Sequence, residues 1–405
     1  MEKRKLLSLL VGICLVVVLA ALPFMAACAK PAPAGPIKIG ALLPLTGPYA
    51  MWGGWMKDMI PFALDEVSWQ VAGRPIEAII EDEGGEDISI ALEKAKKLVE
   101  ADNVDIIVGP FYGGSRIAVY PYTASIPKLV VCHLEAAVPE AQNEYVVWTF
   151  PSYIDSQRPL GEYAYKKLGL KTAVSIGADY SCPYEFTQGF TDTFQELGGK
   201  VLQQQWAPLV ETDYMPYLAG IKEADALVST CLGPPAMMTL YTQLAELGLN
   251  KKYRMFQAEA GSIPQFVMDE IGDILLGTLQ CLPYHYSVDN PANRKFVADF
   301  QAKFERMPEF MDANMYVGIQ TMLAGLEATG GDTDPAKLYQ EIVKLKLDTV
   351  AGPISFIPEG QAITDMYICE VQEVDGKFTQ VITETVRNVV PKIYRGSTYK
   401  KFEER

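Results

Sequence analysis

Short apolar runs alternate with amphipathic segments along most of the chain. Runs of strand length lie at 37–43, 104–108 and 128–132, and segments with apolar residues at helical spacing lie at 51–67 and 88–100. Strands that are buried on both faces of a sheet read as continuous apolar runs, and their alternation with helices is typical of βαβ units. The pattern therefore predicts an α/β protein built around parallel β-sheets.

The alternation of strand-like and helix-like segments is interrupted near residue 150 and then resumes. In this second part we predict helices at 153–168, 183–197, 235–247, 290–306 and 314–329, and strands at 172–176, 200–206, 226–230, 254–257 and 366–374. A chain of 405 residues is too long for one typical core, so two α/β lobes are the simplest account. Such sheets bind ligands outside the carboxyl ends of their strands, which points to the loops after residues 43, 109, 132, 176, 230 and 257.

The first residues have the order of an export signal. Basic residues at 3–5 precede an apolar run at 6–22, and small residues precede Cys28. The run is at or below the length that spans a bilayer, which disfavours a retained transmembrane anchor. The stretch resembles the lipobox of bacterial lipoproteins, with Met25 in place of the usual Leu. We therefore predict a lipoprotein signal peptide at 1–27.

Under this prediction Cys28 is the lipidation site. Its acyl chains hold the protein at a membrane surface, outside the cytoplasm, either in a periplasm or on the outer face of the cell membrane. Residues 28–36 are rich in Pro and Ala and form a semi-rigid tether. An ordinary secretory signal, in which Cys28 is incidental, is the alternative.

Composition excludes several classes of partner. The net charge is −15, whereas nucleic acid and anionic lipid surfaces bind clusters of Lys and Arg, so we expect neither as a direct partner. The chain has two histidines and no C-x-x-C spacing, and we predict no metal and no cofactor. Five cysteines remain beyond the signal peptide and Cys28. We expect buried free thiols, with a Cys281–Cys369 disulfide as the alternative.

Several segments, taken in order, resemble the type I periplasmic binding proteins of the branched-chain amino-acid (leucine/isoleucine/valine) transporter class. They are IKIGALLPLTGPYA at 37–50, IIEDE at 79–83, AKKLV at 95–99, IIVGP at 106–110 and FTDTF at 190–194. The resemblance implies two Rossmann-like lobes that are joined by a three-segment hinge and close on a ligand. It implies the following boundaries: lobe one at 37–148 and 282–349, and lobe two at 151–281 and 353–405.

The resemblance also implies a function. It predicts the extracytoplasmic substrate-binding protein of an ABC importer, a monomer that captures a small carboxylate, aromatic or amide-type solute, an amino acid being one option, and delivers it to a membrane permease. A ligand-sensing receptor of the same fold, acting on a signalling partner, is the alternative. No Ser-His-Asp order, metal cluster or Walker loop is present, so we do not expect an enzyme.

Members of this family hold a ligand carboxylate in the loops after the third and fourth strands. In the first loop, Gly113 and Gly114 follow Tyr112 at a predicted helix start, where backbone N–H groups and the helix dipole favour an anion. Gly113 replaces the serine that is usual in the family. A glycine turn that only caps the helix is the alternative.

The second loop supplies His133, Glu135, Ala136 and Ala137, with Ala137 in place of a common hydroxyl residue. We expect either a polar wall of Arg116, His133 and Glu135, or an ion pair of Arg116 with Glu135 at the surface. Gly113 and Ala137 both lack the hydroxyl group that is usual at their positions in the family, which argues against a standard leucine-type site.

In lobe two the family places an aromatic residue after the first strand, and Tyr184 matches that position better than Tyr180. Leu232 stands in the next loop, where an aromatic residue is usual. Glu259 stands where amino-acid binders hold the ligand's ammonium group, and a surface acid that caps a helix is its alternative.

Aromatic residues gather near the first loop. Tyr49 and Trp52 are the expected pocket members, whereas Trp55, three residues further on, is expected in the core if only one indole faces the ligand. Phe111, Tyr112 and Tyr153 are expected to complete an aromatic wall that suits an apolar or aromatic ligand.

Overall fold

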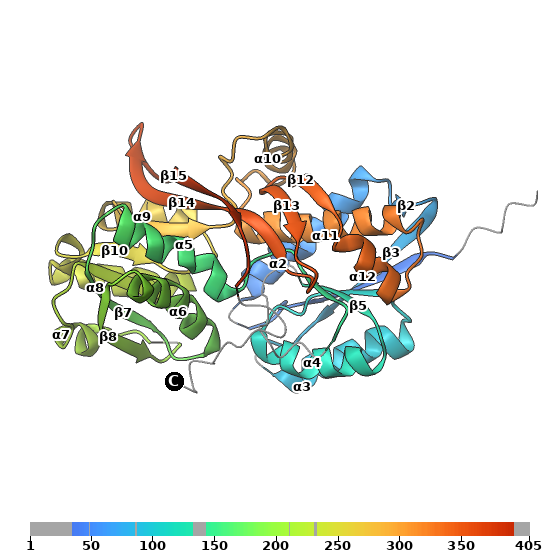
Figure 1. Cartoon of the computed structure of the whole chain (residues 1–405), viewed down its shortest axis with the longest axis horizontal. Coiled ribbons are helices and arrows are strands. Elements are labelled where there is room, and N and C mark those ends of the chain that lie inside the picture. The colour runs from blue at the N-terminus through green and yellow to red at the C-terminus, as the bar shows by residue number, and fades with distance from the viewer. Residues whose placement is uncertain are drawn as a thin grey trace, which may run out of the picture.

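The computed structural model describes residues 35–392, apart from Pro48, Glu86, residues 133–142, Val210 and residues 231–232. Two bodies lie side by side in Figure 1, each built on its own β-sheet. The predicted α/β fold with two lobes is therefore confirmed, while the residue boundaries of the lobes stay a prediction. Below, lobe one is the body with the six-stranded sheet and lobe two the body with the nine-stranded sheet. Cys28 and the predicted signal peptide lie outside the described residues.

The sheet of lobe one has the order β2-β3-β1-β4-β5-β6 and is parallel except for the pair β2–β3. Its strands are β1 (Ile37–Leu43), β2 (Gln70–Val71), β3 (Arg74–Asp82), β4 (Ile106–Val108), β5 (Leu129–Cys132) and β6 (Val146–Trp148). The helices of this lobe are α2 (Ala50–Glu66), α3 (Ile88–Lys96) with a π-helical continuation η1 (Lys97–Ala101), α4 (Gly113–Ser125), α10 (Pro291–Phe304), α11 (Phe310–Ala328) and α12 (Pro335–Ile342).

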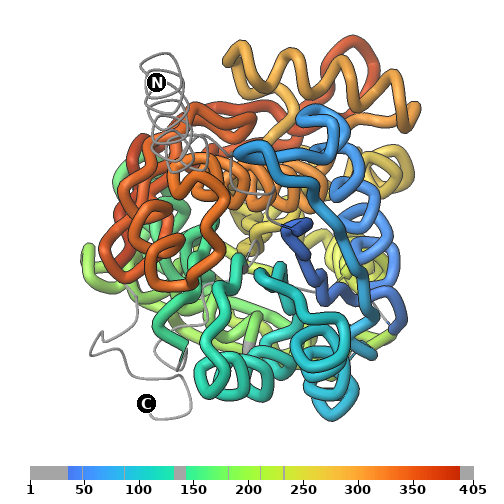
Figure 2. The backbone as a smooth tube through the Cα atoms, turned by 90° about the vertical axis from the view of Figure 1, so that its right-hand side faces the viewer, coloured from blue at the N-terminus to red at the C-terminus, as the bar shows by residue number. Residues whose placement is uncertain are grey.

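Helices cover both faces of the sheet in lobe one, as Figures 1 and 2 show. Helix α3 with its continuation η1, which carries Leu98, and helix α4, which carries Tyr120, bury apolar residues against one face. On the other face α2 packs against α11, and the ring of Phe62 contacts those of Phe296, Phe300 and Tyr316. Segments far apart in the sequence thus share one core, which fixes the start of α2 beside the carboxyl ends of the strands.

The sheet of lobe two has the order β12-β13-β14-β11-β10-β9-β7-β8, with β15 paired to β14. Its strands are β7 (Thr172–Ala178), β8 (Lys200–Ala207), β9 (Ala226–Thr230), β10 (Arg254–Gln257), β11 (Leu279–Leu282), β12 (Lys346–Thr349), β13 (Gly352–Phe356), β14 (Ala362–Val374) and β15 (Lys377–Val389). Its helices are α5 (Tyr153–Lys166), α6 (Ser181–Glu196), α7 (Met215–Ala219), α8 (Gly233–Glu246), the 3₁₀-helix η2 (Leu249–Lys251) and α9 (Gln265–Leu275). Strands β7 to β11 are parallel to one another, and the later strands are antiparallel.

The cysteines on β11 and β14, Cys281 and Cys369, are buried free thiols, as the sequence predicted. The alternative of a Cys281–Cys369 disulfide is wrong, and the strand register gives the reason. Cys281 pairs with Ile368, and Cys369 pairs with Gln280, so the two thiols lie on opposite faces of the sheet.

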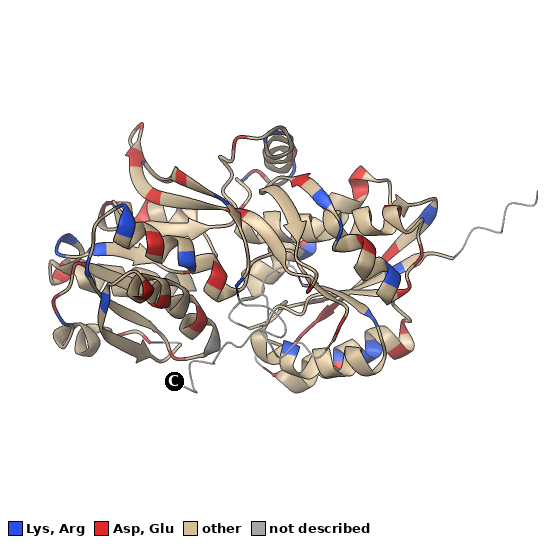
Figure 3. Cartoon of the chain, in the orientation of Figure 1, with Lys and Arg blue, Asp and Glu red and all other residues tan. Residues whose placement is uncertain are grey.

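Asp and Glu residues, red in Figure 3, occur on both lobes, in keeping with the net charge of −15. Within the described part of the chain, no helix combines the length and hydrophobicity that a membrane span requires.

Two adjacent glycines in α2 offer a matched test of how this helix packs. A Cβ on Gly53 would lie 2.1 Å from the carbonyl oxygen of Pro44, whereas a Cβ on Gly54 would meet nothing within 4 Å. We expect Gly53→Ala to lower the free energy of unfolding by about 1–3 kcal/mol because it overpacks this contact. Gly54→Ala should raise it by about 0.5–1 kcal/mol through helix propensity. Denaturant unfolding measures both, and equal effects would contradict the close approach of α2 to the end of β1.

Candidate ligand-binding site

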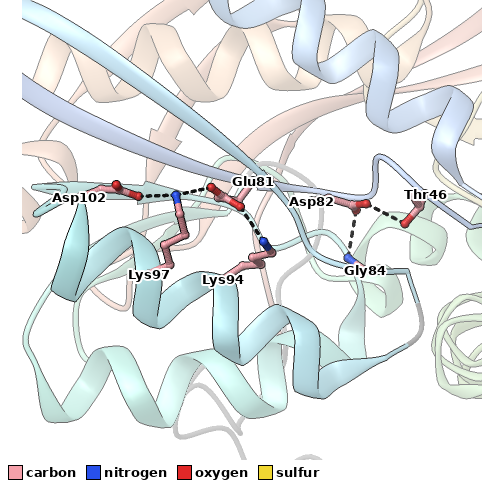
Figure 4. Close-up of polar contacts among 7 residues, drawn as sticks. All are labelled: Thr46, Glu81, Asp82, Gly84, Lys94, Lys97 and Asp102. Carbon is pink, nitrogen blue, oxygen red and sulfur yellow. Dashed lines mark hydrogen bonds and ion pairs between the residues drawn. The ribbon is translucent and has the colours of Figure 1, made fainter.

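Asp82, at the end of β3, fixes the loop that leads from β1 to α2. Its carboxylate accepts hydrogen bonds from Leu45 N (3.1 Å), Thr46 Oγ1 (2.8 Å) and Gly84 N (3.0 Å), the last two of which are drawn in Figure 4. Burial alone raises the pKa of Asp82, but these hydrogen bonds outweigh it and hold the pKa below its ordinary value. The loop is therefore tied down immediately before Tyr49.

Neighbouring ion pairs hold helix α3 onto the same strand. Glu81 pairs with Lys94 (3.2 Å) and Lys97 (2.6 Å), and Lys97 also contacts Asp102 (3.0 Å), as Figure 4 shows. These hydrogen bonds lower the pKa of Glu81, which keeps the pairs ionised at neutral pH.

Tyr49 is the centre of an aromatic cluster in lobe one. Its ring stacks on Trp52 with centroids 4.9 Å apart and planes 8° apart, and it also contacts Phe111 (5.5 Å) and Tyr112 (5.4 Å). The structure thus brings four of the predicted aromatic residues together. Tyr153 lies instead against Phe186 of lobe two (4.1 Å), and Trp55 stacks under the Arg306 guanidinium (4.3 Å).

A tyrosine pair joins the two lobes at this cluster. The hydroxyl of Tyr49 lies 2.7 Å from that of Tyr180, which directly precedes α6. Tyr184, the better match to the family pattern, instead donates to Asp179 and packs edge-on against Trp206 within lobe two. Of these two tyrosines, Tyr180 is therefore the one in hydrogen-bond contact with lobe one.

Gly113 and Gly114 form the first turn of α4, as predicted, but an internal carboxylate lies beside them. Glu83 is fully buried and accepts from Phe111 N (3.2 Å) and Tyr112 N (3.3 Å). Burial raises its pKa to about 8, although the hydrogen bonds from these amides and the charge of Arg116 oppose the rise. Within the described residues, the amides of Gly113 and Gly114 donate to no group, so the start of the helix keeps donors for a ligand anion.

Arg116 and Glu185 bring opposite charges together where the lobes meet. Arg116 in α4 is 4% exposed, so it does not lie at the surface, while its predicted partner Glu135 lies outside the described residues and their ion pair stays a prediction. Its Nε donates to the carbonyl oxygen of Tyr112 (3.4 Å). Loss of solvent raises the pKa of Glu185, the fifth residue of α6, to about 7, and the charge of Arg116 partly offsets this rise. The sequence pattern did not identify Glu185 as a site residue, because its proximity to Arg116 depends on how the lobes pack.

Glu259 belongs to a buried hydrogen-bond network behind the end of β10. It is 9% exposed and accepts from Gln257 Nε2 (2.9 Å), while Gln257 Oε1 accepts from Ser229 and Tyr241. The alternative of an exposed helix cap is therefore wrong: α9 begins at Gln265, six residues later. The network fixes the carboxylate near the strand end, where it can accept a hydrogen bond from a ligand.

Five predicted residues lie outside the described part of the chain: His133, Glu135, Ala136, Ala137 and Leu232. Their roles stay predictions. Among the described residues, no group of three His, Cys, Asp or Glu side chains is placed to hold a metal ion.

Comparisons with known proteins agree with this architecture. Residues 36–377 match the family model described as "Periplasmic binding protein". Leu/Ile/Val-binding protein homolog 6 of Brucella suis biovar 1 (strain 1330) is 26% identical over 366 residues, which cover 89% of this chain and 93% of the relative.

Three solved structures are similar over nearly the whole chain. An ABC transporter substrate-binding protein from Sphaerobacter thermophilus has a TM-score of 0.81 and 26% identity, covering 90% of this chain and all of that one. A Rhodopseudomonas palustris BisB5 solute-binding protein in complex with 3,4-dihydroxybenzoic acid has a TM-score of 0.78, and one from R. palustris with 4-hydroxybenzoate has a TM-score of 0.80. Each is 25% identical and covers 88% of this chain and 98% of its own.

The raised pKa of Glu83 makes a prediction about stability and pH. Glu83 binds its proton more tightly in the folded state than in the unfolded state. The folded protein therefore loses stability as pH rises from the unfolded pKa of this group, near 4.5, to its folded pKa, about 8. Glu83→Gln keeps an acceptor for the two amides but cannot ionise. We therefore expect the melting temperature of Glu83→Gln, relative to the wild type, to rise steadily between pH 5 and pH 8. A difference that is independent of pH would mean that Glu83 does not titrate in this range.

Proposed function

The chain belongs to the periplasmic binding protein family, whose members bind solutes and are not enzymes, and from this premise we propose that it captures a small aromatic carboxylate for an ABC importer. One observation carries the proposal: the stacked Tyr49 and Trp52 lie beside the first turn of α4, whose glycine amides donate to no group among the described residues. A flat ring packs well on such rings, and a carboxylate is favoured by the helix start.

The two lobes have complementary roles in this proposal. Lobe one supplies the aromatic surface and the amides, and lobe two supplies Tyr180 and the Glu259 network. Ligand contacts with both lobes favour the arrangement in which the Tyr49 and Tyr180 hydroxyls meet, and the permease then receives the loaded protein. The two R. palustris proteins with bound hydroxybenzoates support an aromatic acid as the ligand.

The family places the protein outside the cytoplasm. We further propose that it is held there as a monomer by acyl chains on Cys28, which the order of basic, apolar and small residues before this cysteine supports. In this arrangement the Pro-rich segment after Cys28 acts as a spacer between the two lobes and the membrane surface.

A thermal-shift series tests the ligand class. We expect 4-hydroxybenzoate, 3,4-dihydroxybenzoate or benzoate to raise the melting temperature more than leucine does. At a ligand concentration about a hundred times the Kd, binding raises the free energy of unfolding by about 2.7 kcal/mol. For a unit the size of one lobe, this corresponds to a rise in the melting temperature of about 5–10 °C. A shift with leucine and none with the three aromatic acids would contradict the proposed ligand and favour an amino acid.

Removal of one hydroxyl tests the contact between the lobes. Tyr49→Phe keeps the ring but loses the hydrogen bond to Tyr180, so we expect the ligand to bind about three- to tenfold more weakly. Tyr180→Phe should have the same effect, and the double variant should lose no more than either single one. Tyr122→Phe is the control, because its hydroxyl bonds to Glu100 within lobe one. Equal affinities of the Tyr49→Phe protein and the wild type in a calorimetric titration would mean that this contact does not form in the loaded protein.

A further inference from the structure

A second cavity lies between the lobes, and no residue of the candidate site described above lines it. Its volume is about 290 Å³, roughly ten times the share of one water molecule in the liquid. Lobe one contributes Trp55 from α2 and Met307 and Glu309 from the segment before α11, and lobe two contributes Gln380 from β15. His285, in the connection between the lobes, completes the polar part of the lining.

His285 presents a hydrogen-bond donor to this cavity. The side chain is 3% exposed, and its Nδ1 accepts from Ser287 N (3.3 Å) and lies 2.7 Å from Ser287 Oγ. Burial lowers its pKa to about 4, so the ring is neutral at pH 7 and carries its proton on Nε2. Within the described residues Nε2 has no hydrogen-bond partner, so it can donate to a ligand or water in the cavity that His285 lines.

Gln380 presents the complementary acceptor. The side chain is 3% exposed, and its Nε2 donates to Oε1 of Gln280. The orientation is fixed, because Gln280 Oε1 also accepts from Ile263 N (3.1 Å) while its Nε2 donates to the carbonyl oxygen of Gly261 (3.0 Å). The Oε1 atom of Gln380 is left without a hydrogen-bond partner among the described residues.

The charges around the cavity disfavour an anion. Arg306 lies 4.3 Å from the centre of the Trp55 ring, but Asp312 holds it through two hydrogen bonds of 2.7 and 2.8 Å, so its charge is already offset. Glu309 adds a carboxyl group whose oxygen accepts from Ser262 across the lobes. The walls otherwise consist mainly of rings and apolar chains, including Trp55 and Tyr286, whose ring lies 4.2 Å from that of His285.

We propose that this cavity is a second binding site, for a small neutral aromatic amide. A primary amide matches both free groups: its carbonyl accepts from His285 Nε2, and its N–H donates to Gln380 Oε1. Its ring packs against Trp55 and Tyr286. Because both lobes line the cavity, an occupant also stabilises their closed arrangement. This site does not depend on the ligand proposed for the Tyr49 region.

Benzamide and benzoate are a matched pair of probes for calorimetric titration of the full chain. We expect benzamide to bind and benzoate to bind this site at least about tenfold more weakly, because benzoate lacks the N–H donor and adds a charge beside Glu309. His285→Phe and Met307→Trp should each weaken benzamide binding about tenfold. Met307 is 37% exposed, so the larger side chain narrows the cavity without entering a core.

Leu276→Trp is the control for the added indole, because Leu276 is 55% exposed and does not line the cavity. No binding of benzamide up to about 10 mM would overturn the proposal. It would also be overturned if Trp52→Ala abolished benzamide binding while His285→Phe and Met307→Trp left it unchanged, since the amide would then occupy the Tyr49 region. The melting-temperature shift with 4-hydroxybenzoate reports separately on the proposed function.

Discussion

Parallel strands place the loops that follow them at one edge of a sheet, and this constraint decides where the candidate binding residues lie. In lobe one the loops after β1, β3 and β4 carry Tyr49, Glu83 and Gly113. In lobe two the loops after β7 and β10 carry Tyr180 and Glu259. The contact between Tyr49 and Tyr180 shows that these two edges face each other. The chemistry of the site is therefore set by short loops that two rigid sheets hold in place.

This arrangement removes charged side chains from water, which is energetically unfavourable. Glu83 and Arg116 are buried and Glu185 is half-buried where the lobes meet, and ions in such a place need partners. Glu83 and Glu185 have pKa values that burial raises to about 8 and about 7, and Arg116 is the cation that favours their ionised forms. Among the described residues, one cation and two acids with raised pKa values therefore lie near the proposed site. In the proposed binding mode, the amides at the start of α4, rather than Arg116, are the main attraction for a ligand carboxylate.

The alternation of apolar runs predicted most strands of the two sheets. It missed the short strands β2 and β6, and it also missed β11, β12, β13 and β15. Strand β15 had a readable signal, since Asp375 and Gly376 form a turn with positive φ between two strand-like runs. The start of α11 also had a readable signal, because Glu309, five residues before the predicted helix, forms a capping box with Asp312. Both signals are local, so a closer reading of the sequence could have found them.

The arrangement of the site was less predictable, because it depends on contacts between the lobes. Spacing alone does not distinguish Tyr180 from Tyr184, whereas the structure pairs one with Tyr49 and the other with Asp179. The burial of Arg116 and its proximity to Glu185 likewise arise from elements that are more than sixty residues apart. The grouping of Tyr49, Trp52, Phe111 and Tyr112 was predictable, because these residues follow neighbouring strands of one sheet.

A crystal structure of the protein with 4-hydroxybenzoate tests the central claim most directly. The account predicts that the ligand carboxylate accepts hydrogen bonds from the amides of Gly113 and Gly114, with its ring against Tyr49 and Trp52 and with Tyr180 closing from lobe two. A carboxylate bound to other groups, or a ring that contacts neither Tyr49 nor Trp52, would contradict it.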